Sequence, residues 1–508
     1  MTTVAIASST QLAADGGAAV ARTGGNAVDC AIAASLVSVV TEPGICSIGS
    51  GGFLTISAPG EEPVTIDGYV TMPGQDLPAD YSADGSVYVH MDYGGGVDLV
   101  VGHASVATPG SLAACGVASR RFGSLPWAAL FEPAHGHARD GFPLQNVSHN
   151  YLRCSQEAVF NWNEDGFAAI HDSEGNLLRP GDPVHVPYLA DSIELIAREG
   201  PEAFYSGSLA ALIEQDSLAN GGYLTRADLE SFEAVVRDPI VAEGDAWSVY
   251  TNPPPAVGGA TLAAMLLLMQ GRPAEGWTME ELGHWVKVQR AVLGFRRNRL
   301  DMSTDISRDV EALLTAARHG ELGDYKSSPS TVHTSAVDSN GLACAVTLSA
   351  GYGSGVMPPG TGIWMNNCLG ELELNRRGAD WPVGVRLPSN MAPTVARRED
   401  GSVLAIGSAG SSRITTAIVQ SLSNYMNAGM SLGEAVAHPR VHLEEAESGW
   451  QVAYEPGMPA DELDVPSRAF DDLNMFFGGA GVALWTPENG FEVAADPRRG
   501  GGTVIAST

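Results

Sequence analysis

Lysine is nearly absent from this sequence. Lys287 and Lys326 are the only lysines among 28 basic residues, and 59 acidic residues bring the formal net charge to −31. Proteins bind a phosphate backbone or an anionic membrane surface through clustered Lys and Arg side chains. The charge therefore argues against nucleic acid and against a membrane surface as partners. An acidic excess of this kind is typical of a soluble surface.

Long apolar runs and cysteine pairs are also missing. The longest apolar run, residues 260–269, is far shorter than the roughly 20 residues of a membrane-spanning helix, and no cationic segment at the start precedes an apolar one as in a secretory signal. The cysteines are too sparse for a disulfide framework and lack the spacing of a zinc site. They are Cys30, Cys46, Cys115, Cys154, Cys344 and Cys368. We predict a soluble protein of a reducing compartment, the cytoplasm.

No cofactor motif is present either. The glycine-rich stretch IGSGGFLTISAP, residues 48–59, precedes a strand-like run, whereas a phosphate-binding loop opens a helix. The sequence has no dinucleotide fingerprint and no GxSxG turn, and its histidines lack the spacing of metal ligands. We therefore expect neither a cofactor nor a metal.

The composition and the residue patterns predict a folded protein of mixed α and β structure. Of the 508 residues, 44% are hydrophobic and 17% charged. Residues 11–41 read as two helices, with Asn26 as the N-cap of a buried one, and 105–325 read as mostly helical. Alternating polar and apolar residues within 84–105 indicate a short hairpin or a loop.

The composition changes at residues 326–330, KSSPS, which read as an exposed linker. Beyond it, two runs rich in Val, Thr and Ala, 332–337 and 342–349, are joined by DSNG, a strong hairpin signal. Two more strand-like runs, 402–408 and 479–486, flank a helix expected over 412–428. Such an order predicts layers of sheet and helix.

The hydroxyl residues after this linker carry the functional signal. Thr331 opens TVHTSAVDSNGLACAVTLS, which resembles the processing site of the γ-glutamyltranspeptidase family, and YGSGVMPPGTGIWMNN (352–367) resembles that family's glycine loop. Further similar stretches span nearly the whole chain in the right order. They include GGNAVDCAIA (24–33), VATPGSLAA (106–114), PAHGHARDGF (133–142), NPPPAVGGATL (252–262) and GSAGSSRITT (407–416).

The resemblance implies an N-terminal nucleophile hydrolase, with the α/β fold of a four-layer αββα sandwich, made as a proenzyme. Cleavage before Thr331 would leave a large fragment, residues 1–330, and a small one, residues 331–508. Together they would form one globular unit, a heterodimer of the chain's own fragments. Whether that unit assembles further stays open.

A threonine at a new chain end can serve as both nucleophile and base. Its α-amino group, with a reference pKa near 8, can take the proton of its own hydroxyl. Before processing that nitrogen is an amide, so we expect the Thr331 hydroxyl to attack the carbonyl of Ser330 and form an ester that water opens. His333, which matches the family's histidine, then has no proton to transfer, and we expect it to be a hydrogen-bonded structural residue.

The resemblance also places the groups around the nucleophile. The backbone amides of Gly410 and Ser411 correspond to donors for the oxyanion. Ser349 matches a hydroxyl that contacts the nucleophile, and Thr347 stands two residues earlier on the same face, so both could orient the Thr331 amine. An ordinary strand pair rich in Thr and Ser remains the alternative for Thr347 and Ser349.

The substrate pocket departs from the family pattern. Tyr69 stands where the family has an arginine for the substrate α-carboxylate, and a phenol cannot neutralise that charge. The paired serines that also grip it are Ser389 and Asn390 here. The acidic position for the substrate amine falls at Glu371, and Cys368 replaces the usual glutamine.

These residues predict a threonine-nucleophile amidohydrolase or acylase for a small-molecule acyl substrate other than an ordinary γ-glutamyl peptide. Arg376, Arg377, Arg386 and Arg413 could bind a small carboxylate. The alternatives are removal of an oxalyl unit by C–C cleavage in alkylproline-type biosynthesis, a true γ-glutamyl transferase or glutathione hydrolase, and a non-catalytic scaffold.

Overall fold

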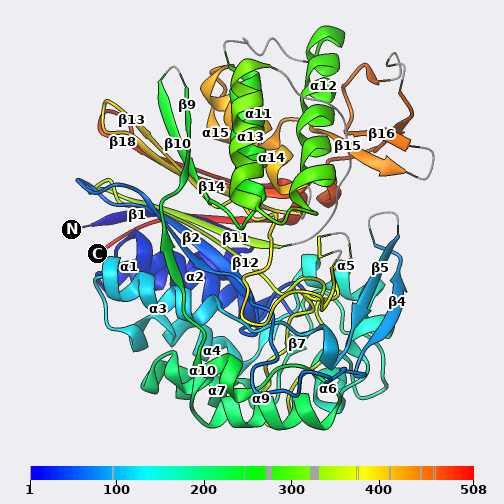
Figure 1. Cartoon of the computed structure of the whole chain (residues 1–508). Coiled ribbons are helices and arrows are strands. Elements are labelled where there is room, and N and C mark those ends of the chain that lie inside the picture. The colour runs from blue at the N-terminus through cyan, green and yellow to red at the C-terminus, as the bar shows by residue number, and fades with distance from the viewer. Residues whose placement is uncertain are drawn as a thin grey trace.

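Two stacked antiparallel sheets form the centre of the molecule (Figure 1). The computed structural model describes residues 2–93, 96–244, 246–270, 277–320, 331–372, 374–375, 377–410, 413–446, 449–460, 463 and 465–508. In order across the seven-stranded sheet, the strands are β20 (Gly502–Ser507), β1 (Thr3–Ser8), β11 (Val332–Asp338), β12 (Ala343–Ser349), β2 (Gly51–Ser57), β3 (Val64–Gly68) and β8 (Val235–Arg237). The six-stranded sheet has the order β19 (Gly490–Ala495), β18 (Gly479–Thr486), β14 (Val403–Ala409), β13 (Thr394–Arg398), β10 (Trp247–Thr251) and β9 (Ile240–Glu243).

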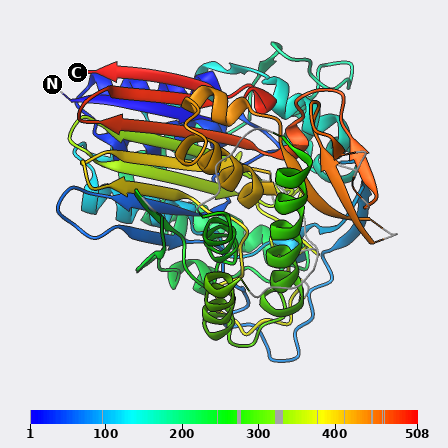
Figure 2. The ribbon, with the colours of Figure 1, turned by 90° about the horizontal axis from the view of Figure 1, so that it is seen from above.

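Helices cover the outer face of each sheet. Those packed on the seven-stranded sheet are α1 (Gln11–Arg22), α2 (Ala27–Thr41) and α3 (Ser111–Phe122). Those on the six-stranded sheet are α11 (Gly258–Met269), α14 (Arg413–Met426) and α15 (Leu432–Ala437), with α12 (Met279–Phe295) and α13 (Ile306–His319) packed beside α11. Figure 2, seen from above, shows helices lying across the strands. This arrangement confirms the predicted αββα layers.

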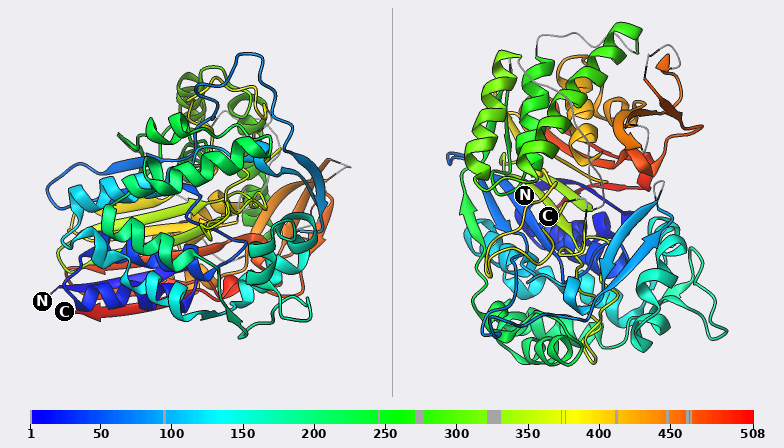
Figure 3. Two further views of the ribbon diagram at one scale, coloured as in Figure 1. Left: turned by 90° about the horizontal axis from the view of Figure 1, so that it is seen from below. Right: turned by 45° about the vertical axis from the view of Figure 1, so that its right-hand side comes forward.

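The remaining elements extend these layers. Helices α4 (Glu132–Asp140), α5 (Asn146–Ser155), α6 (Glu164–Ile170), α7 (Leu189–Glu199), α8 (Glu202–Tyr205), α9 (Ser208–Ala219) and α10 (Arg226–Glu230) lie on the side of α1 to α3 (Figure 3). Three small sheets pair β4 (Val87–Met91) with β5 (Val97–Val101), β6 (Phe142–Pro143) with β7 (Pro183–Val184), and β15 (Val441–Ala446) with β16 (Gly449–Tyr454) and β17 (Ser467–Ala469). Among the described residues, no helix has the length and apolar character to cross a membrane.

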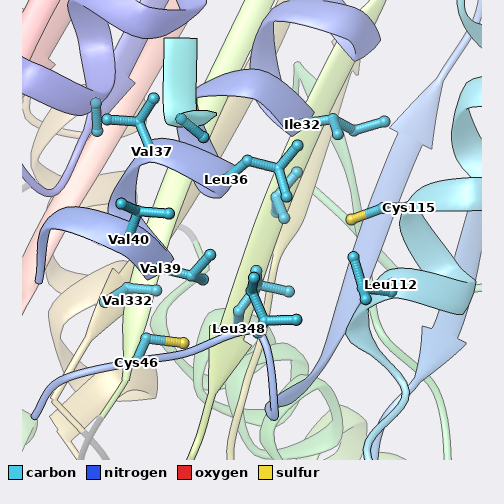
Figure 4. Close-up of a cluster of buried hydrophobic side chains, with 14 of the residues drawn as sticks. Ile32, Leu36, Val37, Val39, Val40, Cys46, Leu112, Cys115, Val332 and Leu348 are labelled. Carbon is cyan, nitrogen blue, oxygen red and sulfur yellow. The ribbon is translucent and has the colours of Figure 1, made fainter. Parts of the chain in front are cut away.

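The packing of α2 follows from its sequence. The Asn26 side chain accepts from the backbone N–H groups of Val28 and Asp29, while Asp29 accepts from the N–H of Asn26, so the predicted N-cap is a full capping box. Every residue of the helix is buried. Its side chains Leu36 and Val39 lie beside Val332 of β11 and Leu348 of β12 (Figure 4).

Alternation along β11 then decides what faces the other sheet. Since Val332 faces the helices, the side chains on either side of it point into the space between the sheets. Further along the same face, Val337 joins a core of small residues with Ala345, Ala405 and Ala483. Small side chains let the sheets approach closely there. The polar residues at the start of β11 are therefore enclosed between two sheets.

Most predicted elements are present, with one omission. The hairpins β4–β5 and β11–β12, strands β14 and β18, and helix α14 confirm the predictions. The stretch 105–325 holds α3 to α13 but also contains the strands β6 to β10, which its helical reading missed. The predicted linker, residues 326–330, lies outside the described residues.

Candidate active site

Thr331 lies immediately before β11 and is buried, with 2% of its surface exposed. In the β11–β12 pair, Val332 is opposite Leu348 and His333 is opposite Thr347, so one step further Thr331 stands opposite Ser349. Residues directly opposite each other in an antiparallel pair share a face. The register therefore gathers Thr331, His333, Thr347 and Ser349 on the face between the sheets.

The pairing of β12 with β2 and of β2 with β3 extends this line of residues across two more strands. Ser349 is opposite Gly51 of β2, and since Gly52 is opposite Gly68, the next step places Gly51 opposite Tyr69. Neighbouring strands lie about 4.8 Å apart, so the backbone of Tyr69, three strand spacings away, lies about 14 Å from the backbone of Thr331. A Cβ placed on Gly51 would lie 3.1 Å from Cδ2 of Tyr69. The glycine thus leaves room for the Tyr69 ring in the row that leads to the nucleophile.

His333 connects several of these groups. Its Nδ1 lies 2.9 Å from the Thr347 hydroxyl and its Nε2 lies 2.7 Å from the hydroxyl of Ser335, which in turn donates to the carbonyl of Gly481 at 3.1 Å. Burial lowers the pKa of His333 to about 3, so the imidazole is neutral at neutral pH. The expectation of a hydrogen-bonded histidine is confirmed.

Gly410 directly follows the last residue of β14. Three residues earlier, within β14, Gly407 packs against His333, so the strand runs from His333 toward the position of Thr331. The φ of Gly410 is +118°, and a Cβ there would lie 2.6 Å from Cα of Gly478, so only glycine fits. Its backbone is thus fixed where an oxyanion donor is expected. Ser411, the second predicted donor, lies outside the described residues.

The predicted pocket residues come together from three separate segments. A chain of side-chain hydrogen bonds runs from Ser389 to the Tyr69 hydroxyl, from that hydroxyl to the sulfur of Cys368, and from the Cys368 thiol to Glu371. Burial, then the neighbouring Cys368 and Glu371, raise the pKa of Tyr69. Burial followed by Glu371 raises the pKa of Cys368 as well. Both groups are therefore neutral.

Glu371 lies between the side chains around Tyr69 and the turn beside Thr331. A Cβ placed on Gly351 would lie 3.0 Å from a carboxylate oxygen of Glu371, and the N–H of Gly351 donates to the Ser349 hydroxyl at 3.1 Å. The Glu371 carboxylate thus lies against the turn that follows Ser349. Asn390, the last predicted pocket residue, is buried, and its backbone carbonyl packs against Gly258 at the start of α11.

A charged clamp behind Tyr69 was missed by the sequence analysis. Asp67 accepts from the Tyr69 N–H at 3.0 Å and from Nε of Arg237 at 2.8 Å. Nε of Arg386 lies 3.6 Å from the same carboxylate, and its terminal nitrogens donate to the carbonyls of Tyr69 and Glu233. A lone acidic residue in the apolar strand VTIDG was the signal that could have revealed the clamp.

The other arginines considered for a carboxylate are engaged elsewhere or lie outside the described part. Nε of Arg413 donates to the carbonyl of Phe476 at 2.9 Å, and its guanidinium lies 4.5 Å from the centre of that ring. Arg377 lies 4.6 Å from the centre of the Trp381 ring. Arg376 is not among the described residues. Within the described ranges, no group of His, Cys, Asp and Glu could hold a metal ion.

Comparisons with known proteins identify the family. A family model described as gamma-glutamyltranspeptidase matches residues 13–506. The glutathione hydrolase proenzyme of Escherichia coli (strain K12) is 30% identical over 97% of this chain and 89% of its own length. The acylase ACY 1 proenzyme of Pseudomonas sp. (strain V22) is 30% identical over 85% of this chain and 81% of its own length.

Two solved structures have a similar fold. The cephalosporin acylase from Bacillus halodurans matches with a TM-score of 0.83 at 24% identity, covering 99% of this chain and 95% of its own. The gamma-glutamyltranspeptidase from Pseudomonas nitroreducens complexed with L-DON matches with a TM-score of 0.51 at 27% identity, covering 63% of this chain and 94% of its own. The chain is therefore an enzyme with the four-layer fold of the N-terminal nucleophile hydrolases, and it belongs to the gamma-glutamyltranspeptidase family.

Proposed function

We propose that this enzyme is a self-processing amidohydrolase, or acylase, with Thr331 as its nucleophile and an acyl donor other than an ordinary γ-glutamyl peptide. One observation carries the proposal. Thr331 is buried immediately before the first residue of β11 and lies opposite Ser349. On the same face of the sheet lies Tyr69, which stands where the family has an arginine.

Processing would free the α-amine of Thr331. The hydroxyl oxygen attacks the carbonyl carbon of Ser330, the bond from that carbon to the Thr331 nitrogen breaks, and the nitrogen takes up a proton. Water then hydrolyses the resulting ester, leaving a carboxylate on Ser330 and a free hydroxyl on Thr331. The relatives named as proenzymes support such a step.

The two fragments would stay together because their strands alternate in the sheets. β1 of the large fragment pairs on one side with β11 and on the other with β20, both from the small fragment. β12 pairs with β2, and β10 pairs with β13, across the same divide. Cutting the chain therefore removes no strand pairing, and the product is a heterodimer with one continuous core.

In turnover the free amine accepts the proton of the Thr331 hydroxyl as its oxygen attacks the substrate carbonyl. The N–H of Gly410 supplies a fixed donor for the oxyanion, a type of group whose loss costs about 10²–10³-fold in rate. The amine then returns the proton to the leaving nitrogen. Water hydrolyses the acyl-enzyme by the same proton transfers in reverse order.

The pocket favours an acyl group without a carboxylate. We place the acyl group beside the neutral side chains of Tyr69 and Cys368, the hydroxyl of Ser389 and the acidic side chain of Glu371, whose carboxylate would repel an anion. The nearby guanidinium of Arg386 faces Asp67 and backbone carbonyls. A γ-glutamyl group would bring its α-carboxylate into these surroundings, whereas a neutral acyl chain matches them.

The test starts from purified wild-type protein and its Thr331→Ala variant. Intact-mass measurement should find two fragments, residues 1–330 and 331–508, in the wild type and one uncut chain in the variant. Rapid quenching with an acyl anilide should add the mass of the acyl group to the small fragment. An active but uncut wild type, or full turnover by Thr331→Ala, would refute the nucleophile.

Specificity is tested with a matched pair of substrates. γ-Glutamyl anilide is compared with an anilide of a neutral acyl chain of the same length, each with and without a dipeptide acceptor. We expect kcat/KM to favour the neutral chain by about 10²-fold or more, since an unpaired buried carboxylate costs several kcal/mol. Preference for the γ-glutamyl donor, stimulated by the dipeptide, would instead support the glutathione hydrolase or transferase alternative.

A further inference from the structure

Two neighbouring arginines near the C-terminus have very different surroundings. They follow Asp496, which caps the short 3-10 turn η7 (Pro497–Arg499) by accepting from the N–H of Arg498 at 3.0 Å. The Arg498 guanidinium pairs with Asp496 at 3.1 Å and with Glu455 at 2.7 Å. Arg499, by contrast, forms no ion pair with any residue that the structure describes, although only 9% of its surface is exposed.

A glycine lets the Arg499 side chain enter the interior. A Cβ on Gly479, at the start of β18, would lie 2.9 Å from Cγ and 3.2 Å from Nε of Arg499, so the side chain lies against this glycine. One terminal nitrogen donates to the carbonyl of Met475 at 3.4 Å. Nε is buried and has no hydrogen-bond partner within the described part of the chain. A buried donor of this kind needs a water molecule or an ion as its partner.

Beside Arg499 lies a cavity of about 20 Å³, between the two sheets. Its lining includes Ser9 after β1, the neutral ring of His333 on β11 and Gly481 on β18, together with Asp496 and Arg499. A Cβ on Gly481 would lie 3.6 Å from Cδ2 of His333, so the missing side chain helps to leave this space open. A single water molecule needs about 10–15 Å³. The cavity therefore takes one small group and is too small for sulfate or phosphate.

The other permanent charges around the cavity balance one another. Asp496 lies 2.7 Å from Arg440 and 3.1 Å from Arg498, and Glu455 pairs with Arg498 on its other side. Two carboxylates and two guanidinium groups therefore cancel. Arg499 adds one positive charge to this buried group without a carboxylate to match it. An unpaired buried charge is unfavourable unless a counterion joins it.

Glu42 is a carboxylate whose charge depends on pH, and it acts on the same region. It is buried behind Ser9, whose hydroxyl donates to it, and it forms no ion pair with Arg499. Burial raises the pKa of Glu42 to about 7, and the charge of Arg499 opposes this rise. Glu42 is therefore mostly protonated below pH 7 and leaves the charge of Arg499 unbalanced. Above pH 7 it is ionised and offsets that charge in part.

We propose that the cavity beside Arg499 is a binding site for a monatomic anion, a halide such as chloride. Arg499 supplies the positive charge and its Nε–H a hydrogen-bond donor. A water molecule would accept from Nε–H but would leave the charge unbalanced. The site lies on the β1 side of β11, whereas Tyr69 follows β3 on the β12 side. It is thus separate from the proposed acyl-binding region and does not depend on the role of Thr331.

Thermal unfolding at fixed protein concentration tests the site, with sodium chloride replacing sodium gluconate at constant ionic strength. Gluconate is too large for the cavity. At pH 5.5 the Tm should rise with chloride and level off, by about 1–3 °C at tenfold above the Kd. Arg499→Gln should lose this rise, whereas Arg153→Gln, at an exposed position of α5, should keep it. No response in the wild type, or an equal response in Arg499→Gln, would overturn the proposal.

The dependence on pH is a second readout. Ionised Glu42 competes with the anion for Arg499, so the Kd for chloride should rise about fivefold or more between pH 5.5 and pH 8.5. In Glu42→Gln it should change little over the same range. The other titratable or charged groups near the cavity, which are the same in both proteins, are His333, Asp496, Glu455, Arg440 and Arg498. The same rise in both proteins would contradict this balance of charges.

Crystals soaked in sodium bromide locate the anion directly. An anomalous peak is expected at hydrogen-bond distance from Nε of Arg499 in the wild type. Arg499→Lys keeps the charge and should keep the chloride response in Tm with a higher Kd, which separates the loss of charge in Arg499→Gln from a folding defect. A cavity peak without anomalous signal, or bromide bound only elsewhere, would show that the cavity holds water and overturn the proposal.

Discussion

The region around Thr331 and the proposed acyl-binding region around Tyr69 are built in different ways. Thr331, Thr347 and Ser349 lie on two adjacent strands, so the register of one ladder sets their separations. Tyr69 follows β3 in the first part of the chain, whereas Cys368 and Ser389 lie in two loops between β12 and β13, and the three side chains meet through hydrogen bonds. A ladder keeps its geometry when single residues change, whereas loops can exchange residues and select another acyl group.

The difference extends to charge. At the nucleophile's end the imidazole of His333 is neutral and its partners are hydroxyls and a carbonyl. Behind the pocket, by contrast, Asp67 with Arg237 and Arg386 forms an ionic clamp on the backbone of Tyr69. Around Thr331, proton transfer would therefore fall to the α-amine that processing frees. The ion pairs of Asp67 hold the backbone of Tyr69 in place, and their charges are paired with each other.

The largest effect within this comparison is expected from Ser349→Ala. The variant removes the hydroxyl directly opposite Thr331, so kcat should fall by about 10²-fold for every acyl donor, with little change in KM. Steady-state kinetics with two unlike donors checks this. Ser349→Thr keeps the hydroxyl that accepts from Gly351 and serves as the control. A loss confined to one donor would mean that Ser349 belongs to the pocket.

A smaller and selective effect is expected from Tyr69→Arg. The guanidinium would place a cation beside Glu371 and could pair with a substrate carboxylate, so the ratio of kcat/KM for γ-glutamyl over neutral anilide should rise about tenfold. Processing should be unaffected, since the side chain lies three strands from Thr331. Tyr69→Phe keeps the stacking on Phe53 and should leave the ratio nearly unchanged. A slowed processing step would contradict the separation of the two regions.

Local patterns explain how much the sequence could predict. The capping box of Asn26, the hairpin β11–β12 and the hydroxyl row all follow from neighbouring residues and turn chemistry. The fit of His333 between Gly407 and Gly481 could not be predicted, because it depends on how two sheets stack. The clamp on Asp67 likewise depends on arginines that lie about 170 and 320 residues away in the chain.

The cleavage position and the second oxyanion donor are among the calls that remain predictions. The boundary between the fragments falls between Ser330 and Thr331, and the structure describes only the second of these. Ser411, whose amide would complete the oxyanion site beside Gly410, also lies outside the described residues.

The smallest effect on catalysis is expected from Glu42→Gln, a change outside both regions that acts on stability. Glu42 follows α2 and is buried, with its carboxylate accepting from Ser9, whose hydroxyl also lies 2.9 Å from that of Ser38. Burial raises the pKa of Glu42 from 4.5 to about 7, although Ser9, Ser38 and the charge of Arg499 oppose the shift.

Between pH 4.5 and 7 the unfolded chain therefore releases this proton while the folded chain keeps it, so the free energy of unfolding falls as pH rises, by about 1.4 kcal/mol per pH unit. Glutamine is neutral in both states, so the variant should lack this slope and should gain in Tm relative to its parent between pH 5 and pH 7.5. Thermal unfolding in the uncut Thr331→Ala background, where dissociation of fragments plays no part, measures the difference. His333 acts in the opposite sense, since its lowered pKa costs stability only as pH falls below 6.5. Parallel curves for parent and variant would mean that Glu42 is already ionised in the folded protein at pH 5.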